Sequence, residues 1–161
     1  MDKSLNNISL NDETDYGFCF ACGHRNPSSL HLEFRRIGSQ ITTSFLGNEK
    51  HQGFPGYLHG GILSTILDET LSKVSVADNK WTMTAQLNIR FRRPVKIGQL
   101  ITANAHKVRI RGKFLEAKGS VHLPDNSIAA EATGKYAFLK NDSLTYMNKE
   151  YPLLSRERME T

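Results

Sequence analysis

An aspartate in the middle of an apolar helical segment is the residue of this sequence best suited to chemistry. Asp68 lies within residues 60–76, GGILSTILDETLSKVSV, which contain no internal helix breaker. The apolar residues of this segment recur at helical spacings and cover more than one narrow stripe, which predicts a largely buried helix. Because an unpaired carboxylate is costly in such surroundings, the position of Asp68 requires a reason.

The polar residues of the same segment form a stripe that includes the aspartate. One helical face is predicted to carry Gly61, Ser64 or Thr65, Asp68 and Ser72. The alternative interpretation is a stripe that faces solvent, which is what we expect of Glu69 and Lys73.

Two glycines, Gly60 and Gly61, open the predicted helix directly after His59. Glycine has no Cβ, so a ligand carbonyl can approach the backbone N–H groups there, which have no partner within the helix. The helix dipole adds positive potential at this end, so the site is suited to stabilising an oxyanion. The alternative interpretation is a flexible turn between a loop and a helix.

These residues form an ordered set that resembles the PaaI-like acyl-CoA thioesterases of the thioesterase superfamily. The set consists of His59-Gly60-Gly61, then Asp68, then Thr84 at the start of a stretch reading TAQLNIRFRRPV. The stretches HQGFPGYLHGG and CFACGHRNPSSLHLEF are also similar, so the likeness runs from about residue 19 to about residue 139. One departure is Ser29, which stands where the family has a glycine and bears on the local turn.

The resemblance implies that the chain hydrolyses an acyl-CoA thioester to a carboxylic acid and CoA. In that reaction Asp68 would be the nucleophile or general base, and Thr84 would position the carboxylate or the attacking water. Gly60, with Gly61 beside it, would provide the oxyanion site, and His59 would orient the loop and the thioester. A carboxylate can act covalently or by activating water, so both routes stay open. No cofactor is implied apart from the CoA of the substrate.

Two alternatives share the same fold. A hydratase or dehydratase is suggested by His51 and the run Gly53-Phe54-Pro55-Gly56. In that branch the helix usually supplies a glutamate and the histidine directly precedes Phe-Pro, so the match is poor. The second alternative is a non-catalytic acyl-CoA-binding protein, because a fold does not determine a function.

The elements that position these residues are predicted from periodicity and turn signals. Alternation is clearest in residues 83–93, where Met83, Ala85, Leu87, Ile89 and Phe91 share one face. Strands are predicted at 31–36, 41–46, 83–93, 100–110, 114–123 and 128–139, a loop at 47–58, and turns at 111–113 and 124–126.

This order predicts an α+β hotdog fold, an antiparallel sheet wrapped around one long central helix. Residues 25–140 would form the thioesterase domain, with an N-terminal segment at 1–24 and a charged, peripheral tail at 141–161.

Positive charge is concentrated in one segment of the chain. Residues 90–118 have a net charge of +8, whereas the whole chain has +5. Such a surplus attracts nucleic acid, an anionic membrane or a small phosphorylated ligand. Nucleic acid is disfavoured because Phe91 and Phe114 fall on apolar alternations, which predicts that they lie in the core.

The phosphates of CoA provide a natural ligand for this segment, and ordinary solvated charge is the alternative. The candidate CoA-binding residues are Asn88, Arg90, Arg111, Gly112 and Lys113.

Cys19, Cys22 and His24 raise the question of a zinc site. A structural site needs four ligands and the sequence has no second cysteine pair, so we expect no metal and a loosely packed N-terminal clasp.

Two cysteines fit a reducing compartment, and neither a signal-peptide core nor a membrane-spanning run is present. We therefore expect a cytoplasmic protein without a membrane partner.

Helix geometry predicts that two subunits share each active site. Gly60 and Asp68 are eight residues apart, which is about 12 Å along a helix axis. One thioester carbonyl cannot contact both, and the chain is predicted to have one such helix. A homodimer with antiparallel central helices, alone or within a tetramer, would bring Gly60 of one subunit opposite Asp68 of the other.

Overall fold

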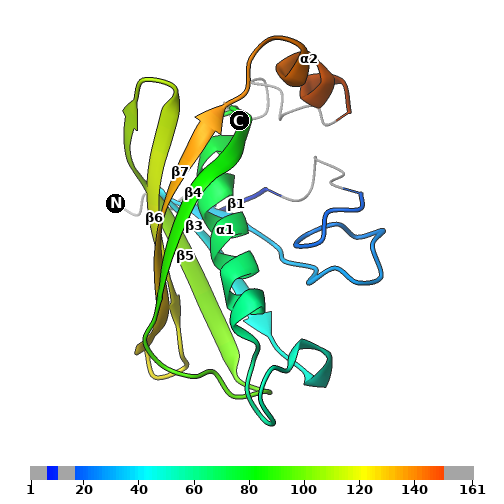
Figure 1. Cartoon of the computed structure of the whole chain (residues 1–161), viewed down its shortest axis with the longest axis vertical. Helices are drawn as coiled ribbons and strands as arrows, with labels where there is room; N and C mark the ends of the chain where they lie inside the picture. The colour runs from blue at the N-terminus through cyan, green and yellow to red at the C-terminus, as the bar shows by residue number, and fades with distance from the viewer. Residues whose placement is uncertain (1–6, 11–16, 151–161) are drawn as a thin grey trace, which may run out of the picture.

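The computed structural model describes residues 7–10 and 17–150, which form a seven-stranded antiparallel sheet with a long helix against one face (Figure 1). The strands lie in the order β1-β2-β3-β5-β6-β7-β4. Their bounds are β1 Asn7–Ser9, β2 Arg35–Ile37, β3 Gln40–Leu46, β4 Thr82–Phe91, β5 Leu100–Arg111, β6 Phe114–His122 and β7 Ile128–Phe138. The helices are α1 Gly60–Val76, α2 Asn141–Glu150 and the short 3-10 turn η1 Glu49–His51.

Helix α1 packs closely on the sheet because the strands beneath it present small residues. Its buried face includes Leu63, Ile66, Leu67 and Leu71. Beneath it the inner face of the sheet buries Ala103, Ala105, Ala117, Ala130 and Ala132. A Cβ placed on Gly119 would lie only 2.7 Å from a methyl group of Leu71. The predicted α+β class and the central helix are therefore confirmed.

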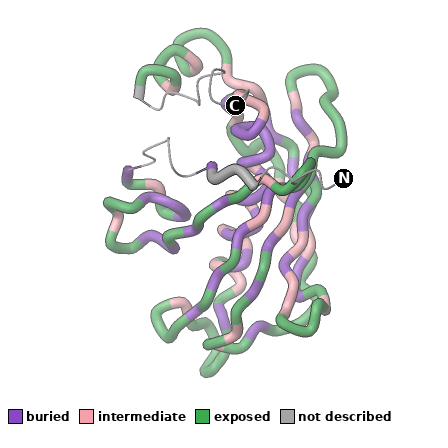
Figure 2. Tube along the Cα trace, turned by 180° about the vertical axis from the view of Figure 1, so that it is seen from behind, coloured by how far each residue is buried: buried purple, intermediate pink, exposed green. Residues whose placement is uncertain are grey.

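Burial alternates along β3, β6 and most of β7, and exposed residues gather at the loops and hairpin turns (Figure 2). The β5–β6 turn contains Gly112 and the β6–β7 turn contains Asn126, with φ of +59° and +65° respectively. Glycine and asparagine tolerate this left-handed backbone conformation, which explains why both turns could be predicted from the sequence.

The segment 17–34 lies on the side of α1 away from the sheet (Figure 1). Its residues Ala21, Cys22, Leu30, Leu32 and Phe34 join the core. The expectation of a loosely packed clasp was wrong, because these side chains bury a second face of α1.

The same segment covers two residues that were expected to face solvent. Lys73 is only 2% exposed, and its Nζ lies 2.9 Å from Glu69 Oε1. A buried ammonium requires a partner, and the neighbouring turn of the helix supplies one. The prediction that Glu69 and Lys73 face solvent was therefore wrong for Lys73, and Glu69 is half-buried.

Several other elements differ from the predictions at the two ends of the chain. Of the strand predicted at 31–36, only Arg35 and Arg36 pair in the sheet, as part of β2. His31 has φ of 50°, and Leu32 N–H donates to Ala21 O, so 31–34 follows the N-terminal segment instead. The sequence analysis did not predict the short strand β1 in the N-terminal segment. It also did not predict the helix α2 in the C-terminal tail.

A β-bulge between Thr84 and Gln86 changes the face that β4 presents. Thr84 lies opposite Tyr136 and Leu87 lies opposite Gly134, two positions that share one face of β7. Thr84 and Leu87 therefore both face α1, although they are an odd number of residues apart. The predicted alternation, which placed Thr84 on the other face, was wrong at this point.

Two apolar residues of β4 are exposed in the single chain, contrary to the prediction of a core face. Met83 is 66% exposed and Phe91 is 53% exposed. Among the described strands β4 pairs only with β7, so one edge of this ten-residue strand is open. Phe114, also expected in the core, is half-buried. The core position of Phe91, which was one ground for disfavouring nucleic acid, was therefore predicted wrongly.

Neither helix in the described part of the chain has the combination of length and apolarity that crossing a membrane requires.

Candidate active site

The carboxylate of Asp68 is held by two hydroxyl groups from the sheet. Thr84 Oγ1 donates to Asp68 Oδ1 at 2.9 Å, and Tyr136 OH lies 3.1 Å from the same oxygen. Tyr136 OH also lies 3.3 Å from the backbone oxygen of Asp68. Within residues 7–10 and 17–150 no hydrogen bond engages Oδ2. One carboxylate oxygen is therefore fixed and the other is available.

The surroundings of Asp68 raise its pKa above the ordinary value for an aspartate. Burial is the largest cause, and the charge of Glu69 acts in the same direction. The hydrogen bonds from Thr84 and Tyr136 oppose this effect because they stabilise the ionised form. Asp68 is thus a carboxylate that is partly desolvated and more basic than usual, as a general base or nucleophile needs to be.

Tyr136 is a site residue that the sequence analysis missed. Burial and the neighbouring Asp68 raise the pKa of its phenol, so the group stays protonated and donates to the carboxylate. The ring packs over Gly134, where an added Cβ would lie 2.4 Å from a ring carbon. A glycine two residues before an inward-facing tyrosine was the available signal, because buried phenols seek a hydrogen-bond acceptor.

The N-terminus of α1 leaves one backbone N–H without an acceptor. His59 is the N-cap residue, and its Nδ1 accepts from Gly61 N–H at 2.8 Å. The N–H groups of Ile62 and Leu63 donate to His59 O. In the described part of the chain Gly60 N–H donates no hydrogen bond. Gly60 is therefore the available donor at the positive end of the helix, whereas Gly61 N–H is committed to His59.

Space around Gly60 is bounded by an aromatic ring of β4. An added Cβ on Gly60 would lie 3.6 Å from the ring of Phe91, which is ordinary contact. Gly60 and Asp68 lie on the same helix, about 12 Å apart along its axis. A single chain thus holds both halves of the predicted site but keeps them apart.

The candidate CoA-binding residues lie in two places on the outer face of the sheet. Arg111, Gly112 and Lys113 line a pocket of about 500 Å³ at the β5–β6 turn. Asn88 and Arg90 line another pocket, of about 510 Å³. Asn88 lies opposite Thr133 and Arg90 opposite Glu131 on β7, so both alternate with the residues that face α1. These candidates therefore point away from Asp68 of the same chain.

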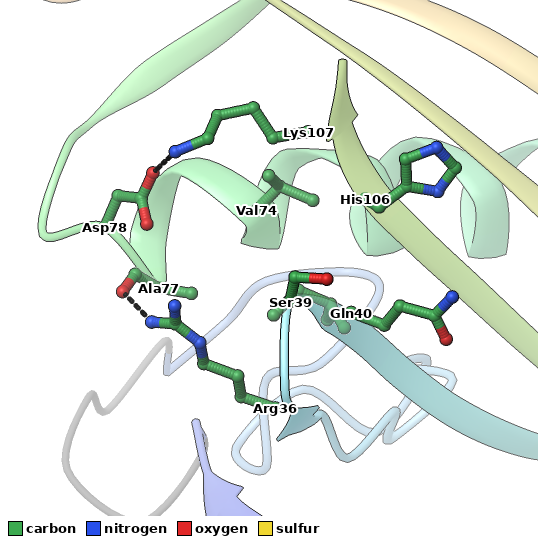
Figure 3. A pocket seen from close by; sticks show the side chains of 9 residues that line it. Arg36, Ser39, Gln40, Val74, Ala77, Asp78, His106 and Lys107 are labelled. Atoms are coloured by element: carbon green, nitrogen blue, oxygen red, sulfur yellow. Dashed lines mark hydrogen bonds and ion pairs between the residues drawn. The ribbon is translucent and has the colours of Figure 1, made fainter. Parts of the chain in front are cut away.

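A further pocket, of about 340 Å³, lies at the C-terminal end of α1 (Figure 3). Arg36 Nη1 donates to Ala77 O at 2.9 Å, and Lys107 pairs with Asp78. A cation at the C-terminus of a helix satisfies free carbonyl groups and opposes the dipole. None of the predicted catalytic residues lies here, so we interpret these contacts as a structural cap.

His51, the residue that suggested a hydratase, is engaged in loop structure. Its ring centroid lies 5.1 Å from that of Phe45, and its Nδ1 accepts from Asn48 N–H. Its backbone oxygen accepts from His59 N–H at 2.9 Å. These contacts hold the loop before α1 in place, and burial lowers the pKa of the imidazole.

Comparison with known proteins places this geometry in a family context. Residues 55–130 match the family model of the thioesterase superfamily. Mouse acyl-coenzyme A thioesterase THEM4 is 27% identical over 68% of this chain, and the bovine protein of that name is 35% identical over 61%. The matches cover 46% and 40% of those proteins, so the chain spans less than half their length.

Solved structures share the fold. A thioesterase superfamily protein superposes with a TM-score of 0.71 and 21% identity, covering 75% of this chain and 60% of its own. Escherichia coli PaaI superposes with a TM-score of 0.65 and 15% identity, covering 70% and 82%. A Streptococcus mutans protein with bound acetyl-CoA gives 0.61 and 18%, covering 64% and 83%. The predicted hotdog fold is confirmed.

Proposed function

This chain carries a thioesterase-superfamily sequence on a hotdog fold, and from that premise we propose that it hydrolyses acyl-CoA thioesters. The observation that carries the proposal is the environment of Asp68. A partly desolvated carboxylate has one oxygen fixed by Thr84 and Tyr136 and the other oxygen free. That arrangement orients a nucleophile or general base without neutralising it.

The reaction needs a carboxylate and an oxyanion donor near one thioester. In the water-activating route Asp68 takes a proton from water, and the hydroxide attacks the thioester carbon. In the covalent route Asp68 attacks that carbon directly and water later cleaves the mixed anhydride. Both routes place negative charge on the carbonyl oxygen, which Gly60 N–H would stabilise, and both expel the CoA thiolate. The protein provides these groups itself, and the proposal includes no cofactor.

We propose that the two halves of the site come from two subunits. The open edge of β4 offers a row of backbone groups that a second copy can pair with, and Met83 and Phe91 on that strand are exposed. Pairing of two β4 strands about a twofold axis would place the two α1 helices side by side and antiparallel. Gly60 of one subunit would then lie opposite Asp68 of the other.

The basic residues of the outer face are proposed to hold the phosphates of CoA. Arg111 and Lys113 share their pocket with Lys135, and Arg90 shares its pocket with Lys118 and His106. These positive groups lie on the opposite face of the sheet from Asp68 of the same chain. They would therefore bind the phosphates of a substrate that passes over the edge of the sheet at the boundary between two subunits.

The relatives support this assignment in their printed names and titles. The mammalian relatives are acyl-coenzyme A thioesterases, and solved structures of the fold were determined with acetyl-CoA and with coenzyme A. Two solved structures from one bacterial thioesterase carry alanine at an aspartate and at a threonine sixteen residues later. Asp68 and Thr84 have the same separation in this chain.

A thiol-release assay over short, medium, long and aromatic acyl-CoAs tests the proposal. We expect turnover of at least one class, and a fall in kcat of about 10² or more in Asp68→Asn. Glu33→Gln, an exposed position, is the matched control. Binding of acyl-CoA without turnover of any class would favour the non-catalytic alternative, and equal turnover by Asp68→Asn would overturn the mechanism.

A further inference from the structure

Cys19 and Cys22 form a cluster with two charged residues of α1, outside the proposed thioesterase site. The ligand atoms of Cys19, Cys22 and Glu69 all lie within 4.8 Å of one another. Lys73 Nζ lies 3.6 Å from Cys22 Sγ and 2.9 Å from Glu69 Oε1. Both cysteines are free thiols. The proposed hydrolysis uses none of these four groups.

The turn that holds the two cysteines is tight and directs backbone donors to the first one. Gly23 N–H donates to Cys19 O at 2.9 Å, and a Cβ on Gly23 would lie 2.4 Å from Gly17 O. The side chain of Cys22 lies against Cys19 Sγ, and the N–H groups of Ala21 and Cys22 point toward the same sulfur. These contacts lower the pKa of Cys19 to about 6, and this residue is only half-buried. Cys19 is therefore the accessible thiolate of the pair.

The second cysteine is buried and keeps its proton beside a carboxylate. Cys22 Sγ donates to Glu69 Oε1 at 3.3 Å, and contact with Cys19 and burial raise the pKa of Cys22. Lys73 is almost fully buried and fixes Glu69 by an ion pair. Glu69 can thus accept the proton of Cys22 at the moment when Cys22 must become a nucleophile.

A metal ion suits this cluster less well than a pair of reactive thiols. In the described part of the chain the cluster offers three ligands, one fewer than a closed zinc site. The ammonium of Lys73 already lies against two of them, where it would repel a divalent cation. The asymmetry between an accessible Cys19 and a buried Cys22 has no function in a metal site but is what thiol–disulfide exchange requires.

We propose that Cys19 and Cys22 are a redox-active dithiol, in which Cys19 attacks, Cys22 resolves and Glu69 accepts the proton of Cys22. The co-reactant is a low-molecular-weight disulfide. The thiolate of Cys19 attacks one sulfur, the bond between the two sulfurs breaks, and one thiolate leaves. Cys22 transfers its proton to Glu69 and attacks the sulfur of Cys19, which expels the second thiolate. The dithiol is oxidised to a disulfide, and the small disulfide is reduced to two thiols.

Glutathione disulfide is the probe for the first test, applied to the reduced full chain and followed by alkylation and mass spectrometry. We expect the wild-type chain to form an internal disulfide between Cys19 and Cys22. Cys22→Ser should accumulate a glutathione adduct on Cys19, whereas Cys19→Ser should leave Cys22 unmodified over the same time. Equal trapping at both cysteines, or a wild-type chain that stays fully reduced, would overturn the proposal.

A second test addresses Glu69 through the rate of ring closure. Glu69→Gln should accumulate the mixed disulfide on Cys19 and slow its conversion to the internal disulfide by roughly tenfold or more. Glu33→Gln, on an exposed residue, should close at the wild-type rate. An unchanged rate in Glu69→Gln would remove the carboxylate from the mechanism. Stoichiometric zinc uptake by the reduced chain that protects both thiols from glutathione disulfide would show a metal site instead.

Discussion

At the scale of single residues, Asp68 is held between opposing effects. Burial destabilises its charge, while two hydroxyl donors from Thr84 and Tyr136 stabilise it. Burial is the larger effect, so the folded chain carries a carboxylate with a raised pKa. A folded state that favours the protonated form must lose stability when that group ionises, and this cost is measurable.

Asp68→Asn should therefore be at least as stable as the wild-type protein at neutral pH. The raised pKa means that the contribution of Asp68 to wild-type stability is greatest below the unfolded value of 3.8 and is lost as pH rises through the folded value. Asparagine keeps an acceptor for Thr84 and Tyr136 but has no charge. Thermal denaturation between pH 4 and 8 should show a difference in Tm that favours the variant and grows with pH. A variant less stable than wild type at pH 7 would contradict this account.

Tyr136→Phe should impair turnover without removing it. The loss of one hydrogen bond to the carboxylate predicts a fall in kcat of about 3- to 10-fold. Because that bond lowers the pKa of Asp68, its loss should also move the acidic limb of the kcat profile to higher pH. Tyr146→Phe, which removes an exposed phenol from α2, is the matched control. A profile that keeps its acidic limb in place would show that Tyr136 has only a structural role.

At the scale of secondary-structure elements, the β5–β6 turn is where we propose that the phosphates of CoA bind, away from the Asp68 carboxylate. Arg111, Gly112 and Lys113 lie at the tip of a hairpin on the outer face of the sheet. Groups that contact only the nucleotide of CoA bind the ground state and the transition state equally, so their removal affects KM and leaves kcat nearly unchanged.

Changing Arg111→Ala together with Lys113→Ala should raise KM for acyl-CoA with little loss of kcat. A truncated pantetheine thioester lacks the nucleotide phosphates, so its KM should not respond to the double change. Steady-state kinetics with both substrates measure this difference directly. An equal rise in KM for the truncated substrate would exclude phosphate recognition by this turn.

At the scale of the whole molecule, the single chain is incomplete for the proposed reaction. Its oxyanion donor and its carboxylate lie at separate turns of α1, and an edge strand of ten residues has one open side. The proposed second copy, placed about a twofold axis, would pair the open edge and complete the site.

Mixing two inactive variants tests the shared site. Asp68→Ala removes the carboxylate, and Gly60→Val blocks the oxyanion donor at a position where an added Cβ makes only ordinary contact. After joint unfolding and refolding at equal concentration, random pairing should restore roughly a quarter of wild-type activity, since each heterodimer has one intact site. Each variant refolded alone is the control. A mixture verified to contain heterodimers but without activity would reject the shared site.

The sequence by itself determined the central helix and the strands that follow it. Residues 60–76 have no breaker and follow a capping histidine, and glycine or asparagine marks the later hairpin turns, so these elements agree with the structure within about two residues. Asp68 was identifiable as a candidate because the apolar residues of this helix predict burial, and a buried carboxylate is costly. These signals depend on residues close together in the chain, so they can be predicted from the sequence alone.

Only the tertiary structure decided which side chains meet around Asp68. The bulge in β4 turns Thr84 toward α1 against the local alternation, and it depends on pairing with β7. Tyr136 reaches Asp68 from 68 residues away, and the N-terminal segment buries Lys73 beside Cys22, 51 residues distant. Such contacts depend on how strands and loops pack across the chain. No periodicity within a single segment encodes them, because packing free energy is gained only when distant segments meet.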